Sequence, residues 1–213
     1  MATSQAERLR ALIGTQPVIP VVRIDDLAHA VPMAKALVAG GLPAIEVTLR
    51  TPVALDAIRL IIDEVPGAIV GAGTILDARQ FDAAEKAGAK FIVSPGTTQE
   101  LLDAARTAPT PLLPGAITPS EIMAMREEGY GFLKFFPAEQ SGGASFLKAI
   151  SAPIPDMLFC PTGGVSPSNV ATWLGLPNVA CVGGSWVVPD AAVKAGDWAE
   201  VERLSREAAA LRA

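Results

Sequence analysis

Short apolar runs alternate with longer amphipathic segments along the chain. The runs are bounded by glycine, proline or polar residues, and their length is typical of buried strands. Eight runs meet this description: residues 17–23, 44–49, 68–74, 91–96, 111–117, 132–137, 157–164 and 179–186. The segments between them are rich in Ala, Leu and charged residues, and several end at glycine or open with a proline-led sequence such as TPSEIMAM. This pattern predicts strands and helices in alternation.

Eight strands separated by helices are typical of a parallel barrel in which a helix follows each strand. An open doubly wound sheet would more often show fewer strands and a GxGxxG fingerprint, and no such sequence follows residues 17–23. With 213 residues the chain is long enough for one sizeable core and a little short for two domains. We therefore predict an α/β fold, a single-domain (β/α)8 TIM barrel over residues 1–213, with an N-terminal helix at 4–14 and a C-terminal helix at 197–211.

Composition and charge narrow the class of partner. Half of the residues are hydrophobic and 18% are charged, which excludes a disordered chain, and no apolar window is long enough to predict a membrane span. The net charge of −5 and the lack of a basic tract argue against nucleic acid or an anionic membrane surface as partner. The first residues lack the features of a secretory signal. We expect a soluble, cytoplasmic protein whose ligands are small molecules.

The residues that commonly bind metals do not form a metal-site pattern. Cys160 and Cys181 lack the paired spacing of a zinc site and the number needed for a disulfide framework, so we expect two buried thiols. The single histidine, His29, lies in a helical segment away from any strand end and is interpreted as a surface residue. We expect no metal and no cofactor, and we interpret the tryptophans as packing residues: Trp173, Trp186 and Trp198.

Polar side chains gather where the predicted strands end, which is where (β/α)8 barrels carry their chemistry. In the run AIEVTLR, period-two alternation places Glu46 and Arg50 on the face that should point into the barrel. In the run FLKFFP, Lys134 shares a face with two phenylalanines. Other polar, proline and glycine positions end further strands: Thr74, Pro95, Thr162, Gly163, Gly164, Gly183, Gly184 and Ser185.

A lysine among aromatic side chains suggests nucleophilic chemistry. Desolvation by Phe132 and Phe136, together with a nearby guanidinium, disfavours the ammonium form, and the neutral amine is a nucleophile. It can form a protonated imine with a ketone, and the imine accepts the electrons of a breaking carbon–carbon bond. The carboxylate of Glu46 can carry the protons that these steps exchange. Arg50 offers a forked donor for a substrate carboxylate, and Thr74 adds a hydroxyl.

Glycine-rich turns after the seventh and eighth strands predict a phosphate site. Backbone N–H groups of such turns commonly hold phosphate in barrel enzymes, which indicates the turns TGG at 162–164 and GGSW at 183–186. Arg23, at the end of the first strand, could add a charge contact. The ligand would be an anionic keto acid with a phosphate at its far end.

Each of these residues also has an interpretation without chemistry. A single lysine near a strand end is usually a solvated or snorkelling side chain. Glu46 and Arg50 could form a structural ion pair that plugs the barrel, and paired glycines could simply form tight turns.

An ordered set of motifs resembles a known family. The segments PVIPVVR, AIEVTLRTP, AIVGAGTIL, FIVSPG, FLKFFPAE, FCPTGGVSPSN and GGSWVVP are similar to those of the bacterial 2-keto-3-deoxy-6-phosphogluconate (KDPG) and 4-hydroxy-2-oxoglutarate aldolases, from about residue 12 to the C-terminus. The resemblance implies a (β/α)8 barrel that assembles as a homotrimer. It also implies a Schiff base on Lys134, acid/base catalysis by Glu46, and binding of the pyruvate carboxylate by Arg50 and Thr74.

The remaining roles implied by the resemblance concern phosphate and pocket shape. Phosphate would be bound by Gly163, Gly164 and Ser185, stereochemical choice would depend on Thr162, and the pocket would be shaped by Pro95 and Phe136.

The expected reaction is reversible cleavage of KDPG to pyruvate and glyceraldehyde 3-phosphate, as in the Entner–Doudoroff pathway. Cleavage of 4-hydroxy-2-oxoglutarate to pyruvate and glyoxylate is a related activity. Three rival functions stay open: a phosphate-binding barrel isomerase or epimerase with Lys134 only as a charge, an aldolase for the galactonate epimer, and a catalytically silent binding or assembly module.

Overall fold

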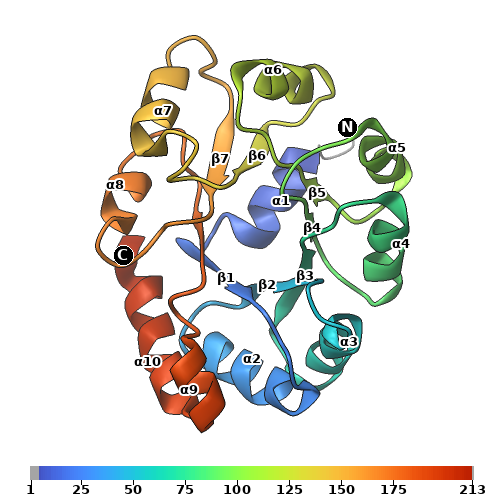
Figure 1. Ribbon diagram of the computed structural model, residues 1–213, viewed down its shortest axis with the longest axis vertical. Helices are drawn as coiled ribbons and strands as arrows, with labels where there is room; N and C mark the ends of the chain where they lie inside the picture. The colour runs from blue at the N-terminus through green and yellow to red at the C-terminus, as the bar shows by residue number, and fades with distance from the viewer. Residues whose placement is uncertain (1–4, 213) are drawn as a thin grey trace.

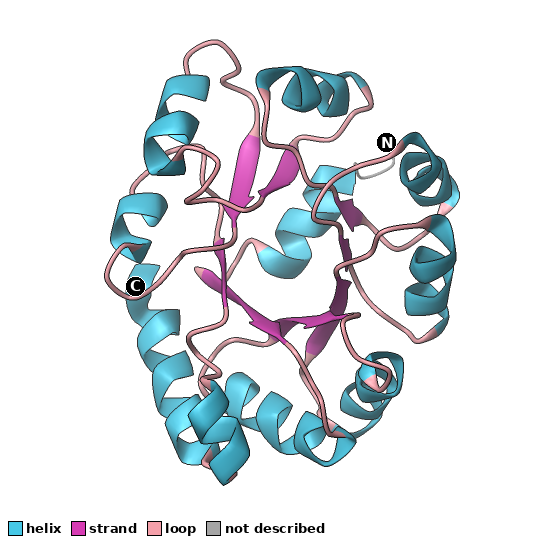
Figure 2. Cartoon of the chain, viewed as in Figure 1, coloured by secondary structure: helices cyan, strands magenta, loops and turns pink. Residues whose placement is uncertain are grey.

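Strands and helices alternate from one end of the molecule to the other. The computed structural model describes residues 5–212. Figure 1 and Figure 2 show the strands around the centre, with most helices outside them. Each predicted apolar run contains one strand. The strands are β1 (Val18–Val22), β2 (Ala44–Thr48), β3 (Ile69–Gly73), β4 (Ile92–Val93), β5 (Leu112–Leu113), β6 (Phe132–Phe135), β7 (Leu158–Pro161) and β8 (Val182–Gly184).

Within residues 5–212, all of the strand pairs are parallel, and they form two sheets. The larger sheet is curled and has six strands in the order β5-β4-β3-β2-β1-β8, and the smaller sheet pairs β6 with β7. Isolated bridges lie between the sheets: Gly115 pairs with Lys134 between β5 and β6, and Thr162 pairs with Gly183 between β7 and β8. The carboxyl ends of the strands therefore meet on one side of the molecule.

Helices follow the strands and cover their outer faces (Figure 2). Side-chain caps begin several of them, including Asp77 before α4 and a capping box of Thr118 and Glu121 at α6. The helices are α1 (Gln5–Ile13), α2 (Ala30–Ala39), α3 (Ala54–Glu64), α4 (Ala78–Lys86), α5 (Gln99–Thr107), α6 (Pro119–Glu127), α7 (Gly143–Ile150), α8 (Val170–Leu174), α9 (Asp190–Ala195) and α10 (Trp198–Ala209), with the 3-10 helices η1 (Leu27–His29) and η2 (Ala210–Arg212).

The two terminal helices have slightly different bounds from the predicted ones. The N-terminal helix was expected at 4–14 and runs over Gln5–Ile13, with residue 4 lying outside the described residues. The C-terminal helix was expected at 197–211, and the structure has Asp197 as the cap of α10 and a 3-10 turn after it. Among the described residues, no helix combines the length and apolar character needed to cross a bilayer.

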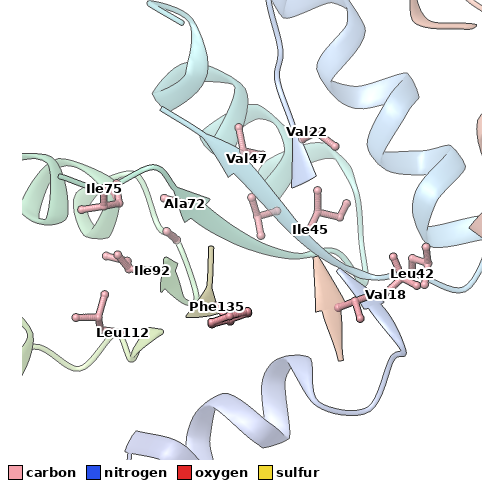
Figure 3. Packing of buried hydrophobic residues seen from close by; sticks show 14 of the residues in the cluster. Val18, Val22, Leu42, Ile45, Val47, Ala72, Ile75, Ile92, Leu112 and Phe135 are labelled. Carbon is pink, nitrogen blue, oxygen red and sulfur yellow. The ribbon is translucent and has the colours of Figure 1, made fainter. Parts of the chain in front are cut away.

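The buried apolar side chains of the described residues form two clusters on opposite faces of the strands. The larger cluster lies between strands and helices, and Figure 3 shows Ile45, Val47 and Ala72 among its members. The smaller cluster lies inside the curled sheet, where α1 packs Leu9 and Ile13 against residues such as Phe91. Full burial of a side chain of this size contributes about 1.5–3 kcal/mol. The inner cluster also contains both cysteines, Cys160 and Cys181.

Candidate active site

A buried lysine and a buried glutamate face each other across the inside of the strands. Lys134 comes from β6 and Glu46 from β2, and their residues are only 4% and 3% exposed. The Lys134 Nζ donates to Glu46 Oε1 at 3.0 Å and to Oε2 at 3.4 Å. This pair joins two sheets through residues that are 88 positions apart in sequence. The carboxylate of Glu46 therefore contacts Lys134, not the Arg50 considered from the sequence.

Strand alternation and one glycine hold the carboxylate in place. On β2, Ile45 and Val47 pack in the outer apolar cluster, so that Glu46 points inward. Gly73 on β3 leaves the space that the carboxylate fills, because a Cβ at this position would lie 2.1 Å from Glu46 Oε1. The centroid of the Phe136 ring lies 5.5 Å from Lys134 Nζ, so the ammonium makes a cation–π contact with this ring.

The buried ion pair is suited to internal proton transfer. Burying two charges carries a desolvation penalty that only close geometry and hydrogen bonding offset. Transfer of a proton from Lys134 Nζ to Glu46 Oε1 would leave a neutral amine beside a carboxylic acid, with no net charge added to the interior. The arrangement can thus supply a nucleophile and an acid/base group from the same two residues.

Arg50 and Thr74 form a second polar group next to this pair. Arg50 follows β2, is exposed, and donates from Nε to Thr74 Oγ1 at 3.1 Å. Thr74 follows β3 with a φ of 60°, a left-handed conformation that is rare for a β-branched residue. Such strained backbone is most often retained at functional sites. In this conformation the Thr74 hydroxyl lies beside the Arg50 guanidinium, where both can meet an anion.

A cavity of about 580 Å³ opens at the carboxyl ends of β1, β7 and β8. Its volume is within the range of small-ligand sites, roughly 300–1,000 Å³. Most of the predicted ligand-binding residues line it: Arg23, Arg50, Phe136, Thr162, Gly163, Gly164 and Ser185. Lys134 and Glu46 do not line this cavity, and Phe136 connects the two regions because its ring contacts both.

The turn after β7 has a shape that requires glycine. Gly163 and Gly164 have φ values of 96° and 79°, and a Cβ on Gly164 would lie 2.4 Å from Glu139 Cγ. Ser185 follows β8, is exposed and lines the same cavity, and β8 is the neighbour of β7 through the bridge between Gly183 and Thr162. Arg23 is also exposed and forms a 2.7 Å ion pair with Asp25, so its charge is already partly balanced.

Besides Lys134 and Glu46, two further predicted site residues do not line the large cavity. Thr74 contacts Arg50 at the edge of that cavity, and Pro95 lines a second cavity of about 270 Å³ between the turns that follow β4 and β5. Phe136 borders both cavities. Thr162 is buried with its Oγ1 3.4 Å from the Cys160 carbonyl oxygen, at the end of β7.

The cavity wall also contains residues that the sequence did not indicate. His29 was interpreted as a surface residue away from the strand ends, but it is half-buried and lines the large cavity. Its ring packs edge-to-face on Trp198, with 5.6 Å between the ring centroids. Asp190 and Lys194 of α9 line the same wall. Because β1 pairs with β8, the segments that follow these two strands meet at one corner. If the first predicted strand had been paired with the eighth, as in a closed barrel, the segment that contains His29 would have been expected near the cavity.

Comparisons with known proteins agree on one family. The family model of KDPG and KHG aldolases matches residues 9–204. A 2-dehydro-3-deoxy-phosphogluconate aldolase of Pseudomonas aeruginosa is 56% identical over 94% of this chain and 91% of its own.

Two solved structures are similar throughout. The KDPG aldolase of Legionella pneumophila, with pyruvate captured at low pH as a covalent carbinolamine intermediate, is 46% identical with a TM-score of 0.93, over 98% of this chain and 99% of its own. The KDPG aldolase of Zymomonas mobilis with 3-phosphoglycerate is 46% identical with a TM-score of 0.90, over 96% of both chains. The chain therefore belongs to the KDPG and KHG aldolase family.

Proposed function

We propose that this aldolase is a class I, Schiff-base lyase that reversibly cleaves KDPG to pyruvate and glyceraldehyde 3-phosphate. The observation that carries the proposal is the buried contact of 3.0 Å between Lys134 Nζ and Glu46 Oε1. A relative more than half identical over nearly the whole chain carries the name of this activity. A solved relative holds pyruvate as a covalent carbinolamine, which is the precursor of an imine.

The first half of the reaction forms the imine on Lys134. Glu46 takes a proton from Nζ, and the neutral amine attacks the C2 ketone to give a carbinolamine. Glu46 then returns a proton to the C2 hydroxyl, which leaves as water. The product is a protonated imine whose nitrogen can accept an electron pair, with Glu46 again a carboxylate.

The second half breaks the carbon–carbon bond. Glu46, directly or through a water, takes the proton of the C4 hydroxyl as the C3–C4 bond breaks. The electrons of that bond pass into the imine, so an enamine stays on Lys134 and glyceraldehyde 3-phosphate leaves. Protonation at C3 and hydrolysis of the imine then release pyruvate and restore the amine.

The proposed substrate contacts follow the arrangement of the cavity. Arg50 and Thr74 would bind the carboxylate of the keto acid, since their hydrogen bond keeps both donors together. Backbone N–H groups around Gly163 and Gly164, together with Ser185 after the neighbouring strand, would hold the phosphate. Three further residues would shape the pocket around the reacting carbons: Thr162, Phe136 and Pro95.

Arg23 would contribute attraction at longer range. Its side chain is exposed and paired with Asp25, which weakens its field at the phosphate. We assign it the smallest part in phosphate binding.

We further propose that the eight strands form one closed (β/α)8 barrel in a single domain over residues 1–213, of which 1–4 and 213 lie outside the described residues. The isolated bridges beside β6 and β8 support closure. A homotrimer and a cytoplasmic location complete the proposal and follow from the family resemblance and the sequence. Sedimentation equilibrium tests the trimer, and a monomeric mass would overturn it.

The same site would also cleave 4-hydroxy-2-oxoglutarate to pyruvate and glyoxylate. The family name covers both substrates, abbreviated KDPG and KHG. This smaller substrate has no phosphate, so it would use the Lys134 end of the site and leave the Gly163–Gly164 turn without a ligand.

Trapping with borohydride tests the proposed chemistry. Wild-type protein is incubated with pyruvate, reduced, and digested, and the added mass is located by peptide mapping; we expect it on Lys134. Lys134→Ala should lose the adduct and turnover, whereas Lys148→Ala, which changes an exposed lysine of α7, should keep both. An adduct absent from folded wild-type protein would instead favour the isomerase, and full turnover in Lys134→Ala would exclude the proposed mechanism.

A further inference from the structure

A side-chain network supports the glycine turn from outside the cavity. Glu139, in the segment between β6 and α7, accepts hydrogen bonds at Oε1 from Asn169 Nδ2 at 3.0 Å and from Trp173 Nε1 at 3.2 Å. Asn169 Nδ2 also donates to the Gly164 carbonyl oxygen at 2.9 Å, and its Oδ1 accepts from the Ser166 N–H at 2.8 Å. The amide of Asn169 thus connects the carboxylate of Glu139 to both sides of the turn.

Main-chain contacts join the same two segments. The Ala138 N–H donates to the Thr162 carbonyl oxygen at 2.8 Å, and the Glu139 N–H donates to the Gly163 carbonyl oxygen at 3.1 Å. Gly164 lies against the Glu139 side chain so closely that a Cβ there would be 2.4 Å from Cγ. The segment that follows the Lys134 strand is therefore bonded along the whole turn.

The turn needs this external support for a physical reason. Two consecutive glycines with positive φ lose more conformational entropy on ordering than other residues, and their own side chains cannot hold them. Trp173 is fully buried, and its indole N–H requires an acceptor, which Glu139 supplies. Because this indole is fixed, its hydrogen bond keeps the Glu139 carboxylate oriented so that Oε1 also accepts from Asn169 Nδ2.

The position of the network separates support from direct binding. Neither Glu139 nor Asn169 lines the large cavity, whereas Thr162, Gly163 and Gly164 do. Asn169 contacts the turn through its hydrogen bond to the Gly164 carbonyl oxygen, and the Glu139 side chain packs against Gly164 and accepts the hydrogen bond of Asn169. Their removal would loosen the binding surface without removing a group that touches the ligand.

We propose that Glu139 and Asn169 are positioning residues that order the Gly163–Gly164 turn for the phosphate of the substrate. This inference rests on the proposed function, in which the turn binds phosphate. Backbone donors that are already ordered bind an anion without a further entropic cost, and loosening them weakens affinity for the phosphorylated substrate alone. Because Glu139 follows β6, the network also connects phosphate recognition to the element that carries Lys134.

The test compares a phosphorylated with an unphosphorylated substrate in steady-state cleavage. In Glu139→Ala and Asn169→Ala we expect KM for KDPG to rise about tenfold, as loss of a charge-assisted hydrogen bond implies. KM for 4-hydroxy-2-oxoglutarate and the rate of borohydride-trapped pyruvate adduct should stay at the wild-type value. Glu127→Ala, which changes an exposed glutamate at the end of α6, serves as the matched control.

Glu139→Gln should restore the low KM, because its amide oxygen can accept from both Asn169 and Trp173 at the single atom that both now contact. An equal rise in KM for both substrates in Glu139→Ala, or no rise for either, would overturn the inference. The proposed function would still stand in that case if the wild-type protein prefers the phosphorylated substrate. Wild-type protein without that preference would overturn both the phosphate site and this inference.

Discussion

The two ends of the strands contrast in what they bury. At the carboxyl ends, Glu46 and Lys134 form a buried ion pair beside a cavity. At the amino ends, α1 packs Leu9 and Ile13 into an apolar cluster. The change occurs within single strands, since β6 carries Phe132 in that cluster and Lys134 two residues later. One end should therefore determine stability, and the other should determine activity.

Leu9→Ala should have the largest effect at the apolar end. The side chain is fully buried, and its truncation should lower the free energy of unfolding by about 2–5 kcal/mol. The kcat of the molecules that stay folded should not change, because none of the residues Gln5–Ile13 of α1 lines the large cavity. Urea denaturation and active-site titration measure the two quantities, and Leu211→Ala, at an exposed leucine, is the control. If Leu9→Ala kept the wild-type free energy of unfolding but lost its activity, the amino end would not be the part that determines stability alone.

Glu46→Gln should have the next largest effect, on the chemical end. The amide can still contact Lys134 but cannot take up a proton, so kcat should fall by about 10²-fold or more. The pyruvate adduct on Lys134 should still be trapped by borohydride. Glu127→Gln on the surface of α6 controls for the loss of one charge. Turnover close to that of the wild type would assign the proton transfers to another group.

Gly73→Ala and Gly131→Ala place the same methyl group at opposite ends. On Gly73 the Cβ would occupy the position of the Glu46 carboxylate, so kcat should fall by about tenfold or more as the acid/base group is displaced. On Gly131, which precedes β6, the Cβ would lie 3.6 Å from the Ala6 Cβ, an ordinary van der Waals contact. Steady-state kinetics on both variants compares the ends directly, and equal losses would remove the distinction.

Thr74→Gly should reverse the usual direction of a stability change. Glycine adopts the φ of 60° without strain, so the free energy of unfolding should rise by up to about 1 kcal/mol. Loss of the hydroxyl that Arg50 contacts should at the same time weaken pyruvate binding. Thermal unfolding and adduct formation at varied pyruvate concentration report the two effects. A less stable variant would show that the strain relieved is smaller than the conformational entropy that glycine adds to the unfolded chain.

Glu121 should give the smallest effect, as a carboxyl-end residue that acts on stability. The backbone N–H groups of Ile117 and Thr118 donate to its carboxylate and hold the pKa of Glu121 below its usual range. Its stabilisation is complete above the unfolded pKa of about 4.3 and is lost as the pH falls through the lower folded pKa. Glu121→Gln should cost a few tenths of a kcal/mol at pH 7. Thermal unfolding should show this difference shrinking as the pH falls below about 4.3, and a difference that grew in that range would contradict the assigned sign.

Local alternation was enough to predict which residues face inward. Period two along β2 and β6 determines that Glu46 and Lys134 leave the strands on the inner face, whatever the strands pack against. Their direct contact could not be predicted in the same way, because it depends on how far the sheet curls across 88 intervening positions. The sequence suggested Arg50 as a partner of Glu46 because that pair is near in the chain.

Strand lengths and turn shapes were harder to predict. The runs at 91–96 and 111–117 give strands of only two residues, since prolines such as Pro95 and Pro114 have no N–H to continue the pairing. His29 belongs to a segment whose path depends on the pairing of β1 with β8, a contact between the two ends of the chain. The support of the glycine turn by Glu139 likewise needs three separate segments to be in place.

The ion pair between β2 and β6 is also a crosslink. Glu46 belongs to the six-stranded sheet and Lys134 to the two-stranded one, and their contact spans the interior between them. In the proposed reaction, Lys134 gives up this contact when it forms the covalent bond to the substrate. The bound substrate, which would contact both sheets, then replaces part of the interaction between them. Amide hydrogen exchange in β6, measured with and without pyruvate, would record this exchange as a change in protection, and identical protection would show that the sheets hold together without it.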